Sequence, residues 1–330
     1  MSNTQPDSQR VIKNRKDHST KKINELRHAL GKTPEVTEYP NLTIIGAGSF
    51  SRLEASEFSD IDMFFFANPD KLEDPRTKEL KLFGKLIQVI SDLKFPKFSG
   101  DCEYLDILSI DKMFDILGSP TDDHQNYFTA RMLLILESQW LYNEAEYEKL
   151  IERVIDYYFK DSELHKDDFR PIFLLNDICR YWKTILLNYE YRRKDDESKT
   201  KKKVHNYKLK YSRMMTCFAT VCAIGAMPTS TNKEEVVKLI KMTPRERLEK
   251  VPKWLPNAQS MVNNLITKYS VFLDMTGLSK TELHQRFATE NNGSKLLEEA
   301  NEFGDAMFEL IKFIDKEKNF ELGLVRHLVI

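Results

Sequence analysis

The sequence predicts an α+β fold, in which an N-terminal domain with a β-sheet and flanking helices precedes a C-terminal all-helical bundle. Two apolar runs within residues 42–66 have the length and residue types of strands. From Thr121 onward, apolar residues recur at helical spacing along almost the whole chain. We therefore expect two domains, residues 1–120 (with 1–20 disordered) and residues 121–330, with the boundary in the stretch from Gly118 to Arg131.

The composition is that of a globular protein. Charged residues make up 31% of the 330 residues and aromatic residues 11%. A formal net charge of −1 argues against a general nucleic-acid coat, although local basic patches remain possible. The four cysteines follow neither a metal-binding nor a disulfide spacing, which suits a reducing cytoplasm. Since no apolar run is long enough to span a membrane and the N-terminus is not typical of a signal peptide, we expect a cytoplasmic protein without a membrane partner.

The chain is organised around the stretch from Leu42 to Phe66. It reads as a strand (residues 42–47), a Gly48-Ser49 turn, a short polar helix, and a second strand that carries Asp60 and Asp62. Side chains alternate along a strand, so these two aspartates are predicted to share one face. Two adjacent carboxylates in an apolar strand repel each other, and Mg²⁺ or Mn²⁺ would relieve that repulsion.

The Gly48-Ser49 turn has the features of a phosphate site. Gly48 allows a ligand to approach the backbone closely, and Ser49 offers a hydroxyl and an N–H at the start of a helix, where anions bind well. Arg52, one helical turn further on, either adds positive charge to this site or pairs with Glu54 or Glu57.

The arrangement Gly48-Ser49, ten residues, then Asp60-Ile61-Asp62 resembles the hallmark of the polymerase-β-like nucleotidyltransferase superfamily. The resemblance covers residues 40–110. Within it, residues 48–66 are similar to stand-alone bacterial nucleotidyltransferases and to the uridylyltransferase-like branch. It implies a mixed sheet with Asp60 and Asp62 as catalytic metal ligands. It also implies Mg²⁺-dependent or Mn²⁺-dependent transfer of a nucleoside monophosphate from a nucleoside triphosphate to an acceptor hydroxyl, with release of pyrophosphate.

Two questions stay open within this resemblance. The acceptor is a protein, a tRNA or a second nucleotide. The alternative to an enzyme is a non-catalytic module that binds a nucleotide and regulates the helical domain.

Superfamily members carry a third carboxylate on the strand beside the two aspartates. Residues 103–110 are the predicted third strand, and Asp106 is our choice because it lies in the middle of it. Asp101 and Glu103 are alternatives near the preceding loop, and Asp106 could instead face solvent on an edge strand.

Further polar residues stand out in the helical domain. Asn176, Arg180 and Lys183 share one face of a predicted helix over residues 170–192. This face either contacts the phosphates of the nucleotide or acceptor, or is an ordinary solvated face. A charged loop is predicted over residues 192–205.

A basic segment follows that loop and opens the next predicted helix. Lys208 and Lys210 are candidates for nucleotide binding, because distant superfamily members hold the triphosphate with a lysine from the helical domain. The interleaved Tyr207 and Tyr211 suggest base stacking.

Two further expectations concern the boundaries of helices. Residues 128–140 are predicted to form one strongly apolar helix, and Asn291-Asn292-Gly293 is predicted to interrupt the helices near the C-terminus.

Overall fold

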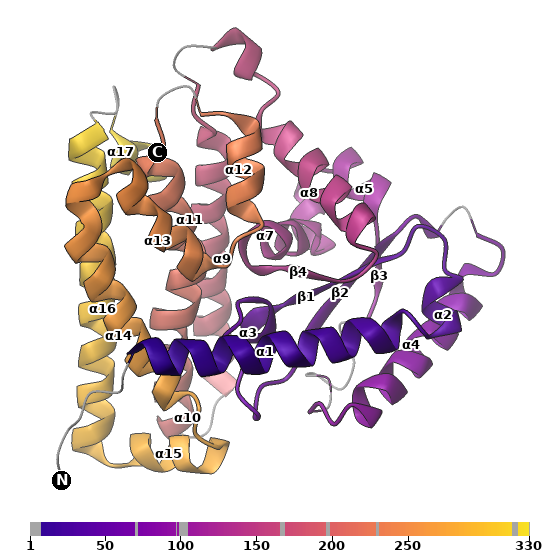
Figure 1. Cartoon of the computed structure of the whole chain (residues 1–330), viewed down its shortest axis with the longest axis horizontal. Helices are drawn as coiled ribbons and strands as arrows, with labels where there is room; N and C mark the ends of the chain where they lie inside the picture. Colours follow the sequence, from indigo (N-terminus) through magenta and orange to yellow (C-terminus); the bar gives the residue numbers. More distant parts are fainter. Residues whose placement is uncertain are drawn as a thin grey trace. The chain divides into compact units, whose positions relative to one another are not determined.

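The computed structural model describes residues 8–69, 72–96, 98, 105–165, 169–195, 199–228, 231–318 and 323–329. Within these residues the chain is mostly helical and contains one four-stranded mixed sheet, so the α+β class is confirmed (Figure 1). The chain divides into two compact units. Residues 14–154 form the sheet unit, and residues 1–13 with 155–330 form the helical unit.

The sheet has the strand order β3-β2-β1-β4. The strands are β1 (Thr43–Ala47), β2 (Asp62–Ala67), β3 (Ile107–Ser109) and β4 (Gln139–Tyr142). Strand β1 is antiparallel to both β2 and β4, whereas β2 and β3 are parallel. The predicted third strand therefore lies beside β2, but β3 covers only Ile107–Ser109, so the prediction that Asp106 lies in the middle of a strand is wrong.

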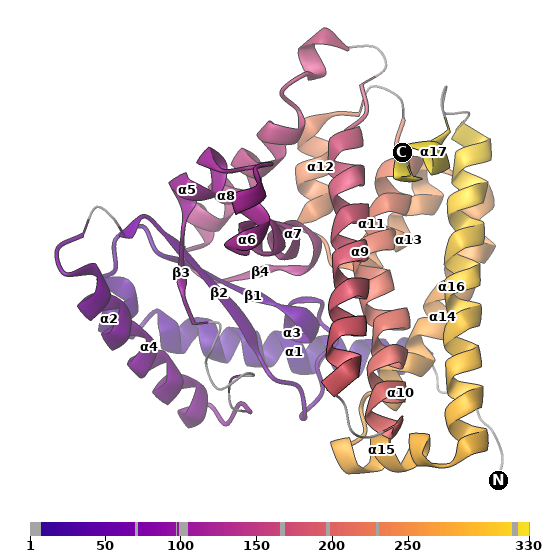
Figure 2. The same cartoon turned by 180° about the vertical axis from the view of Figure 1, so that it is seen from behind.

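Helices cover both faces of the sheet. On one face, α1 (Ser8–Leu30), α2 (Pro34–Thr37) and α4 (Pro75–Asp92) bury an apolar core against alternate strand residues such as Met63 and Phe65 (Figure 1). The opposite face carries α5 (Ile110–Asp115), α6 (Pro120–His124), α7 (Tyr127–Glu137) and α8 (Glu144–Tyr158) (Figure 2).

The division between the units comes later in the chain than the predicted boundary at residue 120. Asp122 of α6 and Arg131 of α7 form a fully buried ion pair, with 2.7 Å between Arg131 Nη2 and Asp122 Oδ2. Strand β4 then returns to pair with β1. The stretch from Gly118 to Arg131 is thus part of the core of the sheet unit and not a linker.

The helix predicted over residues 128–140 is wrong at its C-terminal end. Helix α7 ends at Glu137, Ser138 is extended, and Gln139 begins β4. The preceding α7 is buried on nearly every side, which explains why its apolar run showed no clear amphipathic stripe.

The prediction of disorder over residues 1–20 is also corrected. Helix α1 begins at Ser8, and residues 1–7 lie outside the described part of the chain. Ser19, fully buried within α1, accepts a hydrogen bond from the Ala55 backbone N–H at 3.0 Å. This contact connects the middle of α1 to the rest of the sheet unit.

The helical unit contains the following elements. They are η3 (Ser162–Leu164), α9 (Ile172–Asp195), α10 (Lys199–Lys208), η4 (Leu209–Arg213), α11 (Met214–Ala226), α12 (Lys233–Ile240), α13 (Pro244–Trp254), η5 (Pro256–Ala258), α14 (Gln259–Met275), α15 (Lys280–Ala288), α16 (Glu290–Lys318) and α17 (Leu324–Val329). Helix α11 is buried almost all round and packs against α9, α13 and α16. In the described residues, no helix combines the length and the apolar character required to cross a bilayer.

Two predictions in this unit are corrected. The expected loop over residues 192–205 is largely helical, since α9 extends to Asp195 and α10 begins at Lys199. Gly293 lies inside α16 and does not interrupt it. A Cβ at Gly293 would come within 2.8 Å of the Phe287 carbonyl oxygen. Glycine therefore allows the backbone near the start of α16 to lie close to the end of α15.

Candidate functional site

The turn between β1 and β2 brings Gly48 and Asp62 together. In the antiparallel register Ala47 lies opposite Asp62, which places the next residue, Gly48, at the end of the strand pair. Gly48 has a φ of +69°, and a Cβ built on it would lie 2.5 Å from Asp62 Oδ2. Both the backbone conformation and the contact with the carboxylate therefore require glycine at this position.

Ser49 and Asp60 lie in sequence next to this contact. Ser49 is the half-buried second residue of α3 (Gly48–Ser51), the short helix that the sequence predicted. Asp60 is exposed and precedes β2, which begins only at Asp62. The prediction that both aspartates lie on one strand is therefore wrong, because the chain at Asp60 has no partner strand in the described residues.

Arg52 is ion-paired with two glutamates beside the turn. It is buried and donates from Nε to Glu54 Oε2 at 2.7 Å, and it also forms an ion pair with Glu137 of α7. Glu54 was one of the two partners that the sequence left open. The adjacent Leu53 adopts the left-handed region with a φ of 60°.

Two residues that support the turn were not predicted as part of the site. Glu137 carries a conspicuous charge in the apolar α7, and this was the signal that could have identified it. Gln139 donates from Nε2 to the Ser51 carbonyl oxygen at 3.0 Å, and no feature of the sequence indicates that contact.

The structure places Asp106 beside Glu79 of α4. Asp106 lies one residue before β3 and is exposed. Partial desolvation and the neighbouring Glu79 carboxylate raise the pKa of Asp106 above its usual range.

Within the described residues, no three His, Cys, Asp or Glu side chains are grouped in a way that could hold a metal ion. The alternatives Asp101 and Glu103 lie outside these residues.

Replacing Asp106 with asparagine is expected to stabilise the sheet unit slightly at neutral pH. A raised folded-state pKa means that stability is lost as the pH rises through the unfolded and then the folded pKa of this carboxyl group. Asp106 is exposed, so solvent screens its repulsion from Glu79, and we expect a gain of only a few tenths of a kcal/mol. Urea unfolding at pH 7 and at pH 3 checks this, and a gain of equal size at both values would contradict it.

The remaining predicted residues belong to the helical unit. On α9, Asn176 and Arg180 are half-buried and Lys183 is exposed, and Arg180 Nε lies 3.5 Å from Asp177 Oδ1. This interaction is local to the helix.

The basic segment that follows α10 is only partly available to a ligand. Lys210 Nζ donates to Asn301 Oδ1 of α16, while Lys208 is exposed at the end of α10. Tyr207 and Tyr211 are buried against Phe272, so the predicted stacking of these two tyrosines on bases is wrong.

Comparison with known protein families, with curated proteins and with solved structures finds no match to this chain.

Proposed function

We propose that the chain is a metal-dependent nucleotidyltransferase that transfers a nucleoside monophosphate to an acceptor hydroxyl and releases pyrophosphate. The observation that carries the proposal is the approach of Gly48 to the carboxylate of Asp62. This contact brings the Gly48-Ser49 turn next to the aspartate pair, and these are the two parts of the sequence pattern that resembles the polymerase-β-like superfamily.

The donor set at the turn suits Mg²⁺ or Mn²⁺. Asp62 is half-buried, and Asp60 lies exposed two residues earlier, so both offer carboxylate oxygens. Magnesium is commonly bound by one or two carboxylates together with water and substrate phosphates, so a third protein ligand is not required. When bound, the cation would neutralise charge on the triphosphate.

The residues of the turn take distinct roles in this proposal. Gly48 lets the Asp62 carboxylate lie against the backbone of the turn, and the Ser49 hydroxyl donates a hydrogen bond to a phosphate oxygen. The acceptor oxygen bonds to the α-phosphorus, and the bond from that phosphorus to the leaving pyrophosphate breaks. Asp106 is the candidate to accept the hydroxyl proton, since its raised pKa makes the carboxylate a stronger base, and Asp101 and Glu103 are the alternatives.

A second candidate function is a non-catalytic nucleotide-binding module. One observation favours it: Asp60 lies outside β2, so the two aspartates do not share one strand as the pattern of the superfamily implies. Such a module would retain the Gly48–Asp62 turn and bind nucleotide without turnover.

Two measurements on the full chain separate these functions. Pyrophosphate release is measured with each nucleoside triphosphate, Mg²⁺ and an acceptor from each class: the protein itself, tRNA or a second nucleotide. Thermal shift with the same nucleotides measures binding. The enzyme predicts both signals with at least one nucleotide. Binding without release with every acceptor supports the module, and the absence of binding overturns both.

A further inference from the structure

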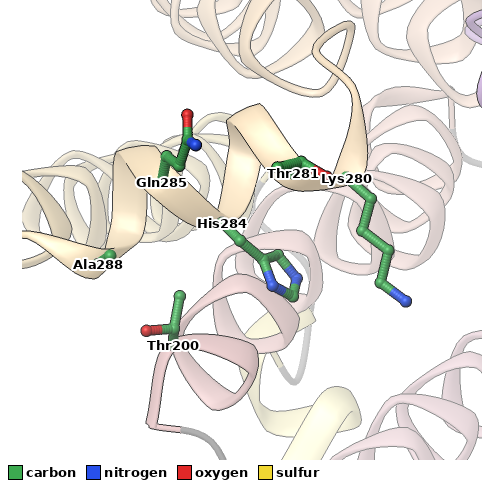
Figure 3. A pocket seen from close by; sticks show the side chains of 6 residues that line it. All are labelled: Thr200, Lys280, Thr281, His284, Gln285 and Ala288. Carbon is green, nitrogen blue, oxygen red and sulfur yellow. The ribbon is translucent and has the colours of Figure 1, made fainter.

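An open pocket lies between α10 and α15 in the helical unit (Figure 3). Its volume is about 450 Å³. His284 extends from α15 toward α10, which carries Thr200, and Lys280 extends from the start of α15. Its lining residues are Thr200, Lys280, Thr281, His284, Gln285 and Ala288. Five of these six side chains carry a polar group.

The helices around the pocket are strongly basic. The sequence of α10 contains no acidic residue, and its lysines are Lys199, Lys201, Lys202, Lys203 and Lys208. In α15, Lys280 and Arg286 accompany a single acid, Glu282, which accepts hydrogen bonds from Ser279 in a capping box. Neither Lys199 nor Lys280 forms an ion pair with another described residue. These charges favour an anion.

The chemistry of the lining fits phosphate groups better than a lipid surface or an aromatic ligand. Lysine, threonine and glutamine are among the side chains that donate to nucleic-acid phosphates. No large hydrophobic side chain is exposed on the described faces of α10 or α15, although insertion into lipid would require one. Tyr207 of α10 is fully buried, so stacking on bases is not available there.

The length of α10 suits a ligand with several phosphates. Its ten residues extend about 15 Å, which corresponds to several successive phosphates along one strand of a nucleic acid. A single inorganic phosphate would contact only a small part of the basic surface.

We propose that the pocket between α10 and α15 is part of a sequence-independent binding site for the phosphodiester backbone of nucleic acid. The inference is independent of the proposed catalytic function, because it rests only on the helical unit. Binding depends on ionic contacts, so it weakens steeply as salt rises.

The test compares two double variants of the full chain. Lys199→Glu with Lys280→Glu reverses a charge at the first position of α10 and of α15, where glutamate is compatible with the helix dipole. The matched control, Lys238→Glu with Lys250→Glu, makes the same change in net charge at exposed sites on α12 and α13. Circular dichroism checks that both variants fold.

Fluorescence anisotropy measures the binding of a labelled single-stranded oligonucleotide of mixed sequence, as RNA and as DNA, between 50 and 200 mM salt. The variant at the pocket is expected to raise the Kd at least about tenfold. It should also reduce the slope of log K against log salt by about 1.4, or about 0.7 for each lost contact. The control variant should keep a slope close to that of the wild-type chain.

Three outcomes overturn the proposal. The wild-type chain fails to bind either oligonucleotide, the two variants weaken binding equally, or the variant at the pocket keeps the wild-type Kd and slope. Vesicles containing phosphatidylserine serve as a second probe, and binding to vesicles without binding to oligonucleotides would identify a lipid surface instead. Equal weakening of RNA and DNA binding, in contrast, supports recognition of the shared phosphodiester backbone.

Discussion

Replacing Asp62 with asparagine is expected to reduce pyrophosphate release at least about 100-fold, the order found when one group that stabilises transition-state charge is removed. Asp62 is the carboxylate that lies against Gly48, and asparagine keeps its shape while removing the negative charge. The free energy of unfolding should change little, because the side chain is half-buried and keeps its volume. A coupled pyrophosphate assay and urea unfolding measure the two effects separately.

Asp92→Asn is the matched control for this variant. Asp92 is an exposed carboxylate at the end of α4, in the same unit, and it is not among the residues of the turn. The control should retain full turnover. If Asp62→Asn also releases pyrophosphate at the wild-type rate, the catalytic role assigned to the turn is wrong.

Replacing Gly48 with valine is expected to abolish measurable nucleotide binding. The new Cβ would lie 2.5 Å from Asp62 Oδ2, so the carboxylate must move away from the turn. The left-handed backbone at Gly48 adds a cost of about 1–2 kcal/mol for a residue with a Cβ, and β-branching makes it worse. Isothermal titration with a nucleoside triphosphate and Mg²⁺ measures the binding, and urea unfolding measures the loss of stability.

Gly84→Ala separates the role of this glycine from a general effect of added side chains. Gly84 lies within α4, and a Cβ there would have no atom within 4 Å. Alanine should therefore stabilise the chain by about 0.5–1 kcal/mol and leave nucleotide affinity unchanged. Unchanged nucleotide affinity in Gly48→Val would place the nucleotide site away from this turn.

The predictable part of the site was local in sequence. The spacing between Gly48 and Asp62 is short, so a strand, a turn and a returning strand could be predicted from residue types alone. The start of β2 at Asp62 could not, because it depends on the register with β1. The same is true of Asp106, which has Glu79 of α4 as its neighbour.

Strand β4 shows the limit of periodicity as a signal. Gln139–Tyr142 follows a buried helix directly and contains Trp140 and Leu141, which suit either structure. Only pairing with β1, nearly 100 residues earlier in the chain, makes it a strand. Tertiary pairing of this kind overrides local propensity.

In the helical unit, the burial of two tyrosines could not be predicted from the sequence either. Tyr207 and Tyr211 are interleaved with lysines in the sequence, which suggested an exposed surface for bases. In the structure they pack with Phe272, Phe287 and Phe303, whose places in the chain are distant. Lys208 is exposed and Lys210 contacts α16, whereas the two tyrosines belong to the core.

The most direct measurement of the central claim is the affinity of a non-hydrolysable nucleoside triphosphate analogue, determined by isothermal titration with and without Mg²⁺. The wild-type chain is expected to bind at least one analogue in Mg²⁺ and to lose most of that affinity in EDTA. Asp62→Asn should bind weakly in both conditions. Equal affinity with and without Mg²⁺, or binding that is unchanged in Asp62→Asn, would contradict a metal–nucleotide site at the Gly48–Asp62 turn.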